Sequence, residues 1–123
     1  MLGREKIMAF AAIRDGARAR EFYEKVLGLS VISEDNFAVV IDANGTMLRL
    51  QKVESFTANV FTVLGWEVSD IRAAVSGLQK RGVTFQKYPW MDQDELGIWS
   101  APSGAQVAWF KDPDGNTLSL TQF

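Results

Sequence analysis

Four aspartates are the first candidates for acid–base or metal chemistry in this chain: Asp15, Asp42, Asp70 and Asp112. The sequence contains no histidine and no cysteine. This removes the commonest metal ligand, the side chain best suited to proton transfer near neutral pH, and every thiolate. Each aspartate lies just before a helix pattern or within a turn, where a carboxylate accepts hydrogen bonds from backbone amides. We therefore predict that all four are structural.

A second group of acids occupies residues 92–95, within the irregular stretch 88–96. Oxygen ligands alone could bind a cation there, but a solvated acidic loop is the favoured interpretation. The same stretch holds Tyr88 and Trp90 on either side of a proline and has no counterpart in the first half of the chain. It predicts a loop, which either covers a binding site or is a surface excursion.

Internal repeats show which elements position these residues. Residues 8–25 align with 63–80, and residues 39–50 align with 109–120. The 123-residue chain therefore reads as one domain of two similar modules, module one at about 5–53 and module two at about 60–123.

Each module is predicted to run from a strand through a helix into further strands. Asp15 and Asp70 are placed as N-caps of two amphipathic helices, which end at Gly28 and Gly82. Predicted strands cover 7–13, 29–33, 37–41 and 47–53 in module one, and 60–68, 83–86, 97–101, 106–111 and the strand of the terminal hairpin in module two.

Two phrases carry a family resemblance. They are Ile13-x-Asp15-x-x-x-Ala19-x-x-Phe22-Tyr23-x-x-x-Leu27-Gly28-Leu29 and Phe110-Lys-Asp-Pro-Asp-Gly-Asn116 with Leu118-x-Leu120. In this order and at this separation they resemble the vicinal oxygen chelate superfamily, which includes glyoxalase I, extradiol dioxygenases and bleomycin-resistance proteins. The resemblance implies an α+β fold with two paired βαβββ modules. Their curled mixed sheet surrounds a central cleft, with helices on the outside.

Family enzymes hold a divalent metal in the cleft through four strand positions, usually His or Glu. The resemblance places these positions at Met8, Arg49, Val63 and Ser119. A thioether, a guanidinium, an aliphatic chain and a hydroxyl do not form a transition-metal site. We therefore expect no metal and no cofactor.

Strand alternation predicts which residues face the cleft. Arg49 and Glu67 are the only charged residues among the strand positions that alternation turns toward the cleft. They therefore either clamp a ligand or pair with each other. Trp66 is expected to face the helix, whereas the orientation of the other tryptophans stays open, and at least one of them is expected to stack on a ligand. The predicted ligand-binding residues are Met8, Phe10, Met47, Arg49, Val63, Glu67, Trp90, Trp99, Trp109, Ser119 and Thr121.

Composition limits the possible partners. The net charge is −2 and no lysine or arginine stripe is present, which argues against nucleic acid. The apolar runs are strand-sized, the N-terminus lacks a signal-peptide core, and the absence of cysteine fits a reducing cytosol. We expect a cytoplasmic protein that does not bind membranes. The resemblance implies a homodimer, because the cleft of family members is often built across a dimer, and symmetric pairing is the commonest form of assembly.

Three functions fit these observations. The favoured one is a metal-free small-molecule-binding protein of the glyoxalase/bleomycin-resistance type, which sequesters a small aromatic or anionic compound and so could confer antibiotic resistance. An enzyme with lyase, isomerase or oxidoreductase chemistry is the alternative, in which Glu67 is the general base and Arg49 stabilises negative charge. A protein-interaction module with a vestigial cleft is the third. Whether the chain is an enzyme stays open.

Overall fold

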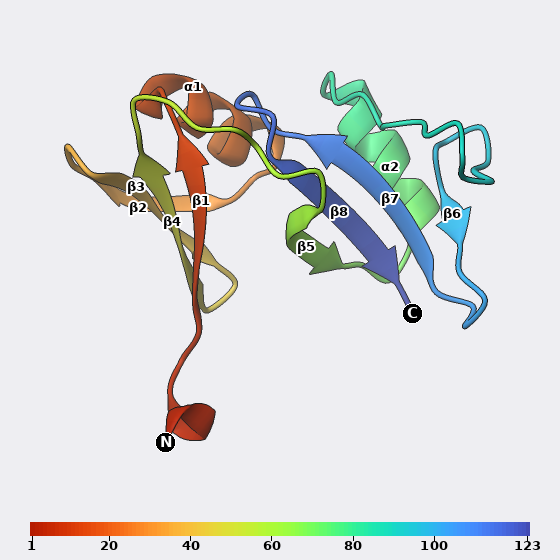
Figure 1. Cartoon of the computed structure of the whole chain (residues 1–123), viewed down its shortest axis with the longest axis horizontal. Coiled ribbons are helices and arrows are strands. Elements are labelled where there is room, and N and C mark those ends of the chain that lie inside the picture. Colours follow the sequence, from red (N-terminus) through yellow and green to blue (C-terminus); the bar gives the residue numbers. More distant parts are fainter. The chain divides into compact units, whose positions relative to one another are not determined.

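The computed structural model describes all 123 residues, which divide into two compact units. Unit 1 is Met1–Thr57 and unit 2 is Ala58–Phe123. Each unit contains one four-stranded mixed sheet, and each follows the order strand, helix, strand, strand, strand (Figure 1). The α+β fold with two βαβββ modules is confirmed.

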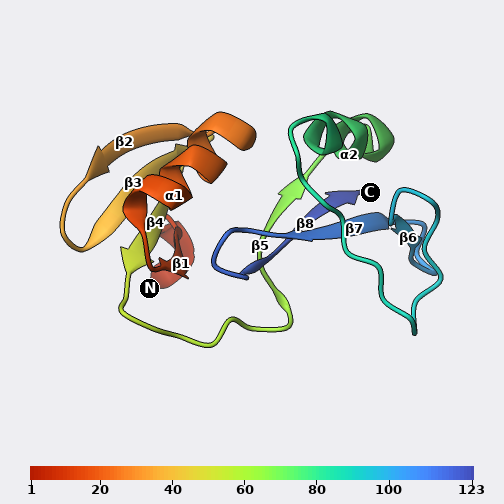
Figure 2. The ribbon, with the colours of Figure 1, turned by 90° about the horizontal axis from the view of Figure 1, so that it is seen from above.

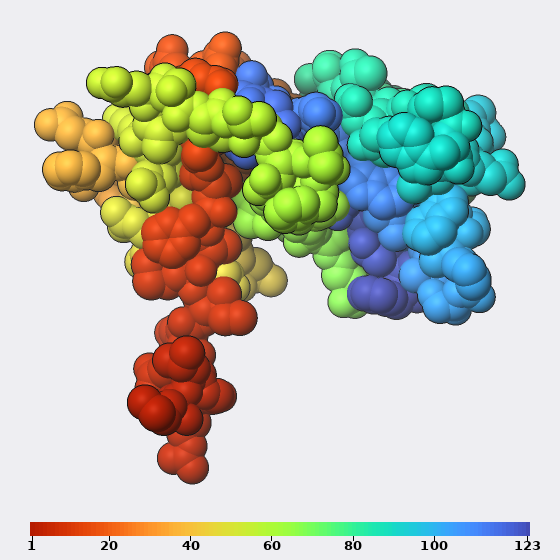
Figure 3. All heavy atoms as spheres, in the orientation of Figure 1, coloured from red at the N-terminus to blue at the C-terminus, as the bar shows by residue number.

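Unit 1 has the strand order β1-β4-β3-β2, with β1 parallel to β4 and the other neighbours antiparallel. The first residues extend beyond its sheet and are red in Figure 3. Its elements are the 3₁₀ turn η1 (Leu2–Arg4), β1 (Met8–Ile13), α1 (Gly16–Arg20), the π-helical segment η2 (Glu21–Val26), β2 (Ser30–Glu34), β3 (Ala38–Ala43) and β4 (Thr46–Lys52).

Unit 2 repeats this plan with the strand order β5-β8-β7-β6, in which β5 is parallel to β8. Figure 2 shows its helix α2 along one face of the sheet. No helix of the chain has both the length and the apolar character needed to cross a membrane. The elements of unit 2 are β5 (Thr62–Glu67), α2 (Ile71–Lys80), β6 (Trp99–Ser100), β7 (Gln106–Lys111) and β8 (Thr117–Gln122).

Both helices begin at the predicted aspartates. The Asp15 carboxylate accepts from the amides of Ala17 and Arg18, and the Asp70 carboxylate accepts from the amide of Ala73. The first helix differs from the prediction, because it changes from α to π geometry after Arg20, and the Leu27 amide donates to the Phe22 carbonyl at 2.9 Å.

Strand registers confirm the internal repeat. Phe10 pairs with Arg49 in unit 1, and the aligned pair in unit 2 is Gly65 with Ser119. One residue breaks the equivalence: Thr62 pairs with Thr117, so Val63 is the extra residue of a β-bulge.

Two predicted strands of module two are shorter than expected. Residues 83–86 form only one bridge, from Phe85 to Phe110, and 97–101 is reduced to β6. Both segments pair with the same edge of β7, since the Gln86 amide donates to the Trp109 carbonyl while Trp99 pairs with Val107. Neither segment can therefore occupy the whole edge.

The two aligned hairpin turns are held by aligned aspartates. Asp42 is exposed, and its Oδ1 accepts from the Gly45 amide at 2.8 Å beside an Asn44-Gly45 turn with φ of 52° and 93°. Asp112 is buried, and its carboxylate accepts from the amides of Asp114 and Asn116 and from the Asn116 side chain at 2.8–2.9 Å. The structural role of the four aspartates is confirmed.

Because Asp112 is buried with three hydrogen bonds and Asp42 is exposed with one, the same substitution should destabilise the protein to different degrees at the two positions. We expect Asp112→Ala to lower the free energy of unfolding by about 2–4 kcal/mol, because it removes three hydrogen bonds from a buried turn. Asp42→Ala, the matched control, should cost about 0.5–1 kcal/mol because it removes one exposed hydrogen bond. Urea unfolding followed by circular dichroism measures both, and equal effects would contradict this account of the turns.

Candidate functional site

Within unit 2, α2 covers one face of the sheet and leaves the other face uncovered (Figure 2). Along β7, Ala108 and Phe110 are buried, and the alternating residues Trp109 and Lys111 point to the opposite face. The Trp109 indole Nε1 donates to the Thr62 hydroxyl at 3.2 Å, which fixes the ring against β5. Trp109 is therefore an oriented aromatic surface on the uncovered face.

Aromatic rings continue from Trp109 in two directions. Trp99 lies on one side, with ring centroids 6.1 Å apart, and Tyr88 lies on the other at 6.0 Å in an edge-to-face arrangement. Trp90 then packs on Tyr88 at 5.0 Å, and 76% of its surface is exposed. The structure thereby orients the three tryptophans that the sequence left open.

Trp66 lies on the other face, as predicted. Its ring stacks with Phe110 at 6.4 Å, and Phe110 also contacts Phe85 at 5.3 Å. These rings belong to the core beneath α2, so they do not contribute to a binding surface.

The aromatic rings of the uncovered face border a pocket of about 540 Å³. Pockets for small molecules lie in the range of about 300–1,000 Å³ and combine aromatic walls with a few polar groups. The pocket is lined by Val60, Phe61, Thr62, Tyr88, Trp90, Met91, Trp109, Lys111 and Thr117.

Gln93 anchors the loop that carries Tyr88 and Trp90. Its amide nitrogen donates to the carbonyls of Gln86 and Gly97 at 3.0 and 2.8 Å, and its oxygen accepts from the Tyr88 amide at 2.7 Å. One side chain thus ties both ends of the loop together, and Trp90 stays exposed between them.

Asp94 and Glu95 anchor the same loop to α2. Both carboxylates pair with Arg72, at 3.0 and 2.8 Å, and Asp94 also accepts from the amides of Leu96 and Ile98. No group of three or more potential metal-binding acids occurs in the structure. The acidic stretch therefore positions the loop.

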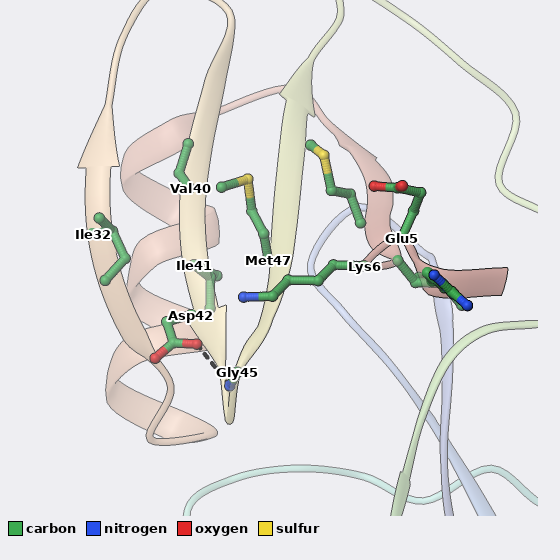
Figure 4. A pocket seen from close by; sticks show the side chains of 11 residues that line it. Glu5, Lys6, Ile32, Val40, Ile41, Asp42, Gly45 and Met47 are labelled. Carbon is green, nitrogen blue, oxygen red and sulfur yellow. Dashed lines mark hydrogen bonds between the residues drawn. The ribbon is translucent and has the colours of Figure 1, made fainter. Parts of the chain in front are cut away.

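In unit 1, β1 and β4 are neighbouring strands, and one face of this pair carries three of the predicted residues. They are Met8, Phe10 and Met47, whose exposed fractions are 46%, 53% and 42%. A pocket of about 690 Å³ extends from this face to the N-terminal segment. Figure 4 shows the side chains of Ile32, Val40 and Met47 on neighbouring strands at this pocket.

Arg49 belongs to the same face and is half-buried. Its guanidinium makes no hydrogen bond or ion pair within unit 1. Its charge helps to lower the pKa of the Asp35 carboxyl, after the larger effect of hydrogen bonds from the amides of Phe37 and Ala38. The Arg49 side chain is therefore available for a ligand.

The predicted residues of unit 2 differ in exposure. Ser119 is buried beside Gly65, Thr121 is half-buried, and Glu67 is exposed. Val63 lies at the bulge, where Thr62 takes the place opposite Thr117.

Of the nine residues that line the pocket, only Trp90 and Trp109 were predicted to bind a ligand. The other seven are Val60, Phe61, Thr62, Tyr88, Met91, Lys111 and Thr117. Lys111 could have been found, because it alternates with Trp109 on one strand. Thr62 could not, since the bulge that turns it toward Trp109 is not visible in the sequence. Tyr88 was recognised only as part of a loop.

The four positions that hold the metal in the family do not fit such an ion here. Met8 and Arg49 lie on β1 and β4, Ser119 on β8, and Val63 at the bulge in β5. None supplies the imidazole, thiolate or carboxylate from which transition-metal sites are built.

We predict that the contribution of Asp94 to the stability of the folded state depends on pH. Burial alone would raise the pKa of this carboxyl, but hydrogen bonds from the Ile98 and Leu96 amides and the Arg72 charge lower it below its ordinary value of 3.8. A lowered pKa stabilises the folded state above 3.8, and this contribution disappears as the pH falls through the lowered value. Asp94→Asn should therefore lower the urea midpoint near neutral pH, and its difference from the wild type should shrink in acid.

The matched control for this experiment is Asp92→Asn, in the same loop, because the Asp92 carboxylate makes no hydrogen bond or ion pair. It should leave the midpoint unchanged at every pH. If the difference in urea midpoint between wild type and Asp94→Asn stays constant down to well below pH 3.8, the proposed link between Asp94 ionisation and stability is wrong.

Known proteins share this architecture. A glyoxalase family protein from Enterococcus faecalis is 19% identical, with 98% of this chain and 99% of that chain covered and a TM-score of 0.75. A member of the Glyoxalase/bleomycin resistance protein/dioxygenase superfamily from Sphaerobacter thermophilus DSM 20745 is 25% identical over 95% and 97% of the two chains, with a TM-score of 0.70. Lactoylglutathione lyase from Agrobacterium tumefaciens is 20% identical over 98% and 95%, also with a TM-score of 0.70.

A search of curated proteins finds no match to this chain. The family model of the Glyoxalase/Bleomycin resistance protein/Dioxygenase superfamily matches residues 7–120, which include both βαβββ modules. The chain therefore belongs to this superfamily, as its two sequence phrases predicted.

Proposed function

We propose that this protein binds and sequesters a small organic compound, aromatic or anionic, without a metal ion. The observation that carries the proposal is the pocket of about 540 Å³ in unit 2, where Tyr88, Trp90 and Trp109 provide aromatic walls. Stacking and apolar contact can hold a planar ligand there without covalent chemistry. Binding of this kind removes a toxic compound from solution, which is how such a protein could confer antibiotic resistance.

The enzyme alternative has less support. Glu67 is exposed, and within unit 2 no side chain positions it as a general base. A general base has to be held within reach of the proton that it removes. The likeness to a lactoylglutathione lyase is at 20% identity and concerns the fold alone.

We further propose that the protein is a cytoplasmic homodimer. The sheet face of unit 1 leaves Met8, Phe10 and Met47 exposed, and a partner chain could cover part of this apolar surface. Symmetric pairing of identical chains is also the commonest form of assembly.

Native mass spectrometry of freshly purified protein tests the proposal as a whole. The expected spectrum is that of a dimer that carries an organic molecule and no stoichiometric transition metal. Elemental analysis after gel filtration is the companion measurement. A bound Zn, Ni, Fe or Mn that is lost when residues of the candidate site are mutated would overturn the metal-free proposal.

We propose separately that Arg49 binds an anionic group at the sheet face of unit 1, because its planar donors suit carboxylate or enolate oxygens. We expect Arg49→Met to weaken binding of anionic compounds by about ten- to a hundredfold, the effect of losing a charge-assisted hydrogen bond. Ligands found by a tryptophan-quenching screen are titrated into wild type and variant, and circular dichroism verifies that both are folded.

Arg18→Met is the matched control, because it removes the same charge from α1 and leaves the sheet face unchanged. It should not alter affinity. If a folded Arg49→Met variant binds anionic ligands as tightly as wild type, Arg49 has no part in recognition.

A further inference from the structure

The lining of the pocket in unit 2 carries a charge of one sign only. This lining contains five aromatic or large apolar side chains besides Val60, but only one charged residue, Lys111, and no Asp or Glu. We propose that this pocket selects a planar aromatic compound with a negative charge, and that Lys111 determines the selection. The inference rests on the proposed small-molecule binding and assigns its charge preference to a residue of unit 2.

The position of Lys111 supports this role. It follows Trp109 by two residues on β7, so both side chains project from the same face of the strand. Lys111 is exposed and makes no ion pair or hydrogen bond, unlike Lys52, which pairs with Glu34 at 2.7 Å. Its ammonium group is therefore available to a ligand that lies on the Trp109 ring.

Aromatic walls by themselves do not indicate an anion, because tryptophan and tyrosine rings also attract cations. The positive charge of Lys111 in the lining distinguishes an anionic from a cationic ligand. A bound cation would be repelled by Lys111 and would find no carboxylate among the lining residues. A bound anion would gain the attraction of Lys111 while its ring kept the aromatic contacts.

The loop at 88–97 supplies two of the aromatic rings that line the pocket, Tyr88 and Trp90. Trp90 packs against Tyr88, yet 76% of its surface is exposed. Gln93 and the Arg72 ion pairs hold the loop that presents it. An indole displayed on an anchored loop beside a pocket is arranged to cover a flat ligand.

Three matched naphthyl probes test the charge preference with the full-length protein: 1-naphthaleneacetate, 1-naphthaleneacetamide and 2-(1-naphthyl)ethylamine. Isothermal titration should give the tightest binding for the acetate and the weakest for the amine. Because Lys111 is exposed, the preference for the acetate over the amide should be about three- to tenfold and should shrink at high salt.

Substitutions test whether Lys111 causes the preference for the acetate over the amide. Lys111→Met should remove the advantage of the acetate and leave affinity for the amide unchanged, whereas Lys111→Arg should retain it. Lys80→Met removes the same charge from the end of α2, outside the pocket, and should behave as wild type. Trp90→Ala should weaken all three probes alike, because it removes aromatic contact and no charge.

Several results would overturn the inference. They are equal binding of acetate and amide by wild type, an unchanged preference in folded Lys111→Met, or no binding of any naphthyl probe. If other compounds from the quenching screen still bind, the proposed function survives these results. If no compound binds and none is carried through purification, the proposed function itself fails.

Discussion

Each sheet of this protein has a helix on one face only, and the period-two alternation of its strands decides which side chains remain available for binding. On β7 this separates Phe110, which packs beneath α2 with Trp66, from Trp109, which lies on the uncovered face. The same alternation places Arg49 and Met47 on the uncovered face of unit 1. A shift of one residue in either register would bury the polar side chains and expose the core.

Chemistry on these faces is limited by the residue types that the chain contains. Without His or Cys, the polar side-chain groups of the chain are carboxylates, cations, hydroxyls and amides, which stand beside aromatic rings and thioethers. The carboxylates Asp15 and Asp70 cap helices, Asp42 and Asp112 hold turns, and the acids at 94 and 95 anchor a loop. The pocket of unit 2 accordingly presents aromatic surface and a single cation, Lys111, to a ligand.

The insertion in module two gives the two repeats different surfaces. Unit 1 reaches the outer edge of its sheet with the five-residue strand β2, whereas unit 2 divides the corresponding edge of β7 between a bridge at Phe85 and the short strand β6. The loop between them carries Tyr88 and Trp90 to the uncovered face, where Tyr88 contacts both Trp90 and Trp109. A shared scaffold thus acquires an aromatic pocket in one half only.

The sequence by itself determined the features that depend on neighbouring residues or on a repeated pattern. Helix caps at Asp15 and Asp70, the Asn44-Gly45 turn and the repeat that aligns Arg49 with Ser119 could all be read before the structure, because their signals lie within a few residues or recur along the chain. The tertiary structure decided what depends on distant partners. The bulge at Val63, the competition for the edge of β7 and the contact of Tyr88 with Trp109 arise from pairing between residues far apart in the chain, and local propensity carries no information about them.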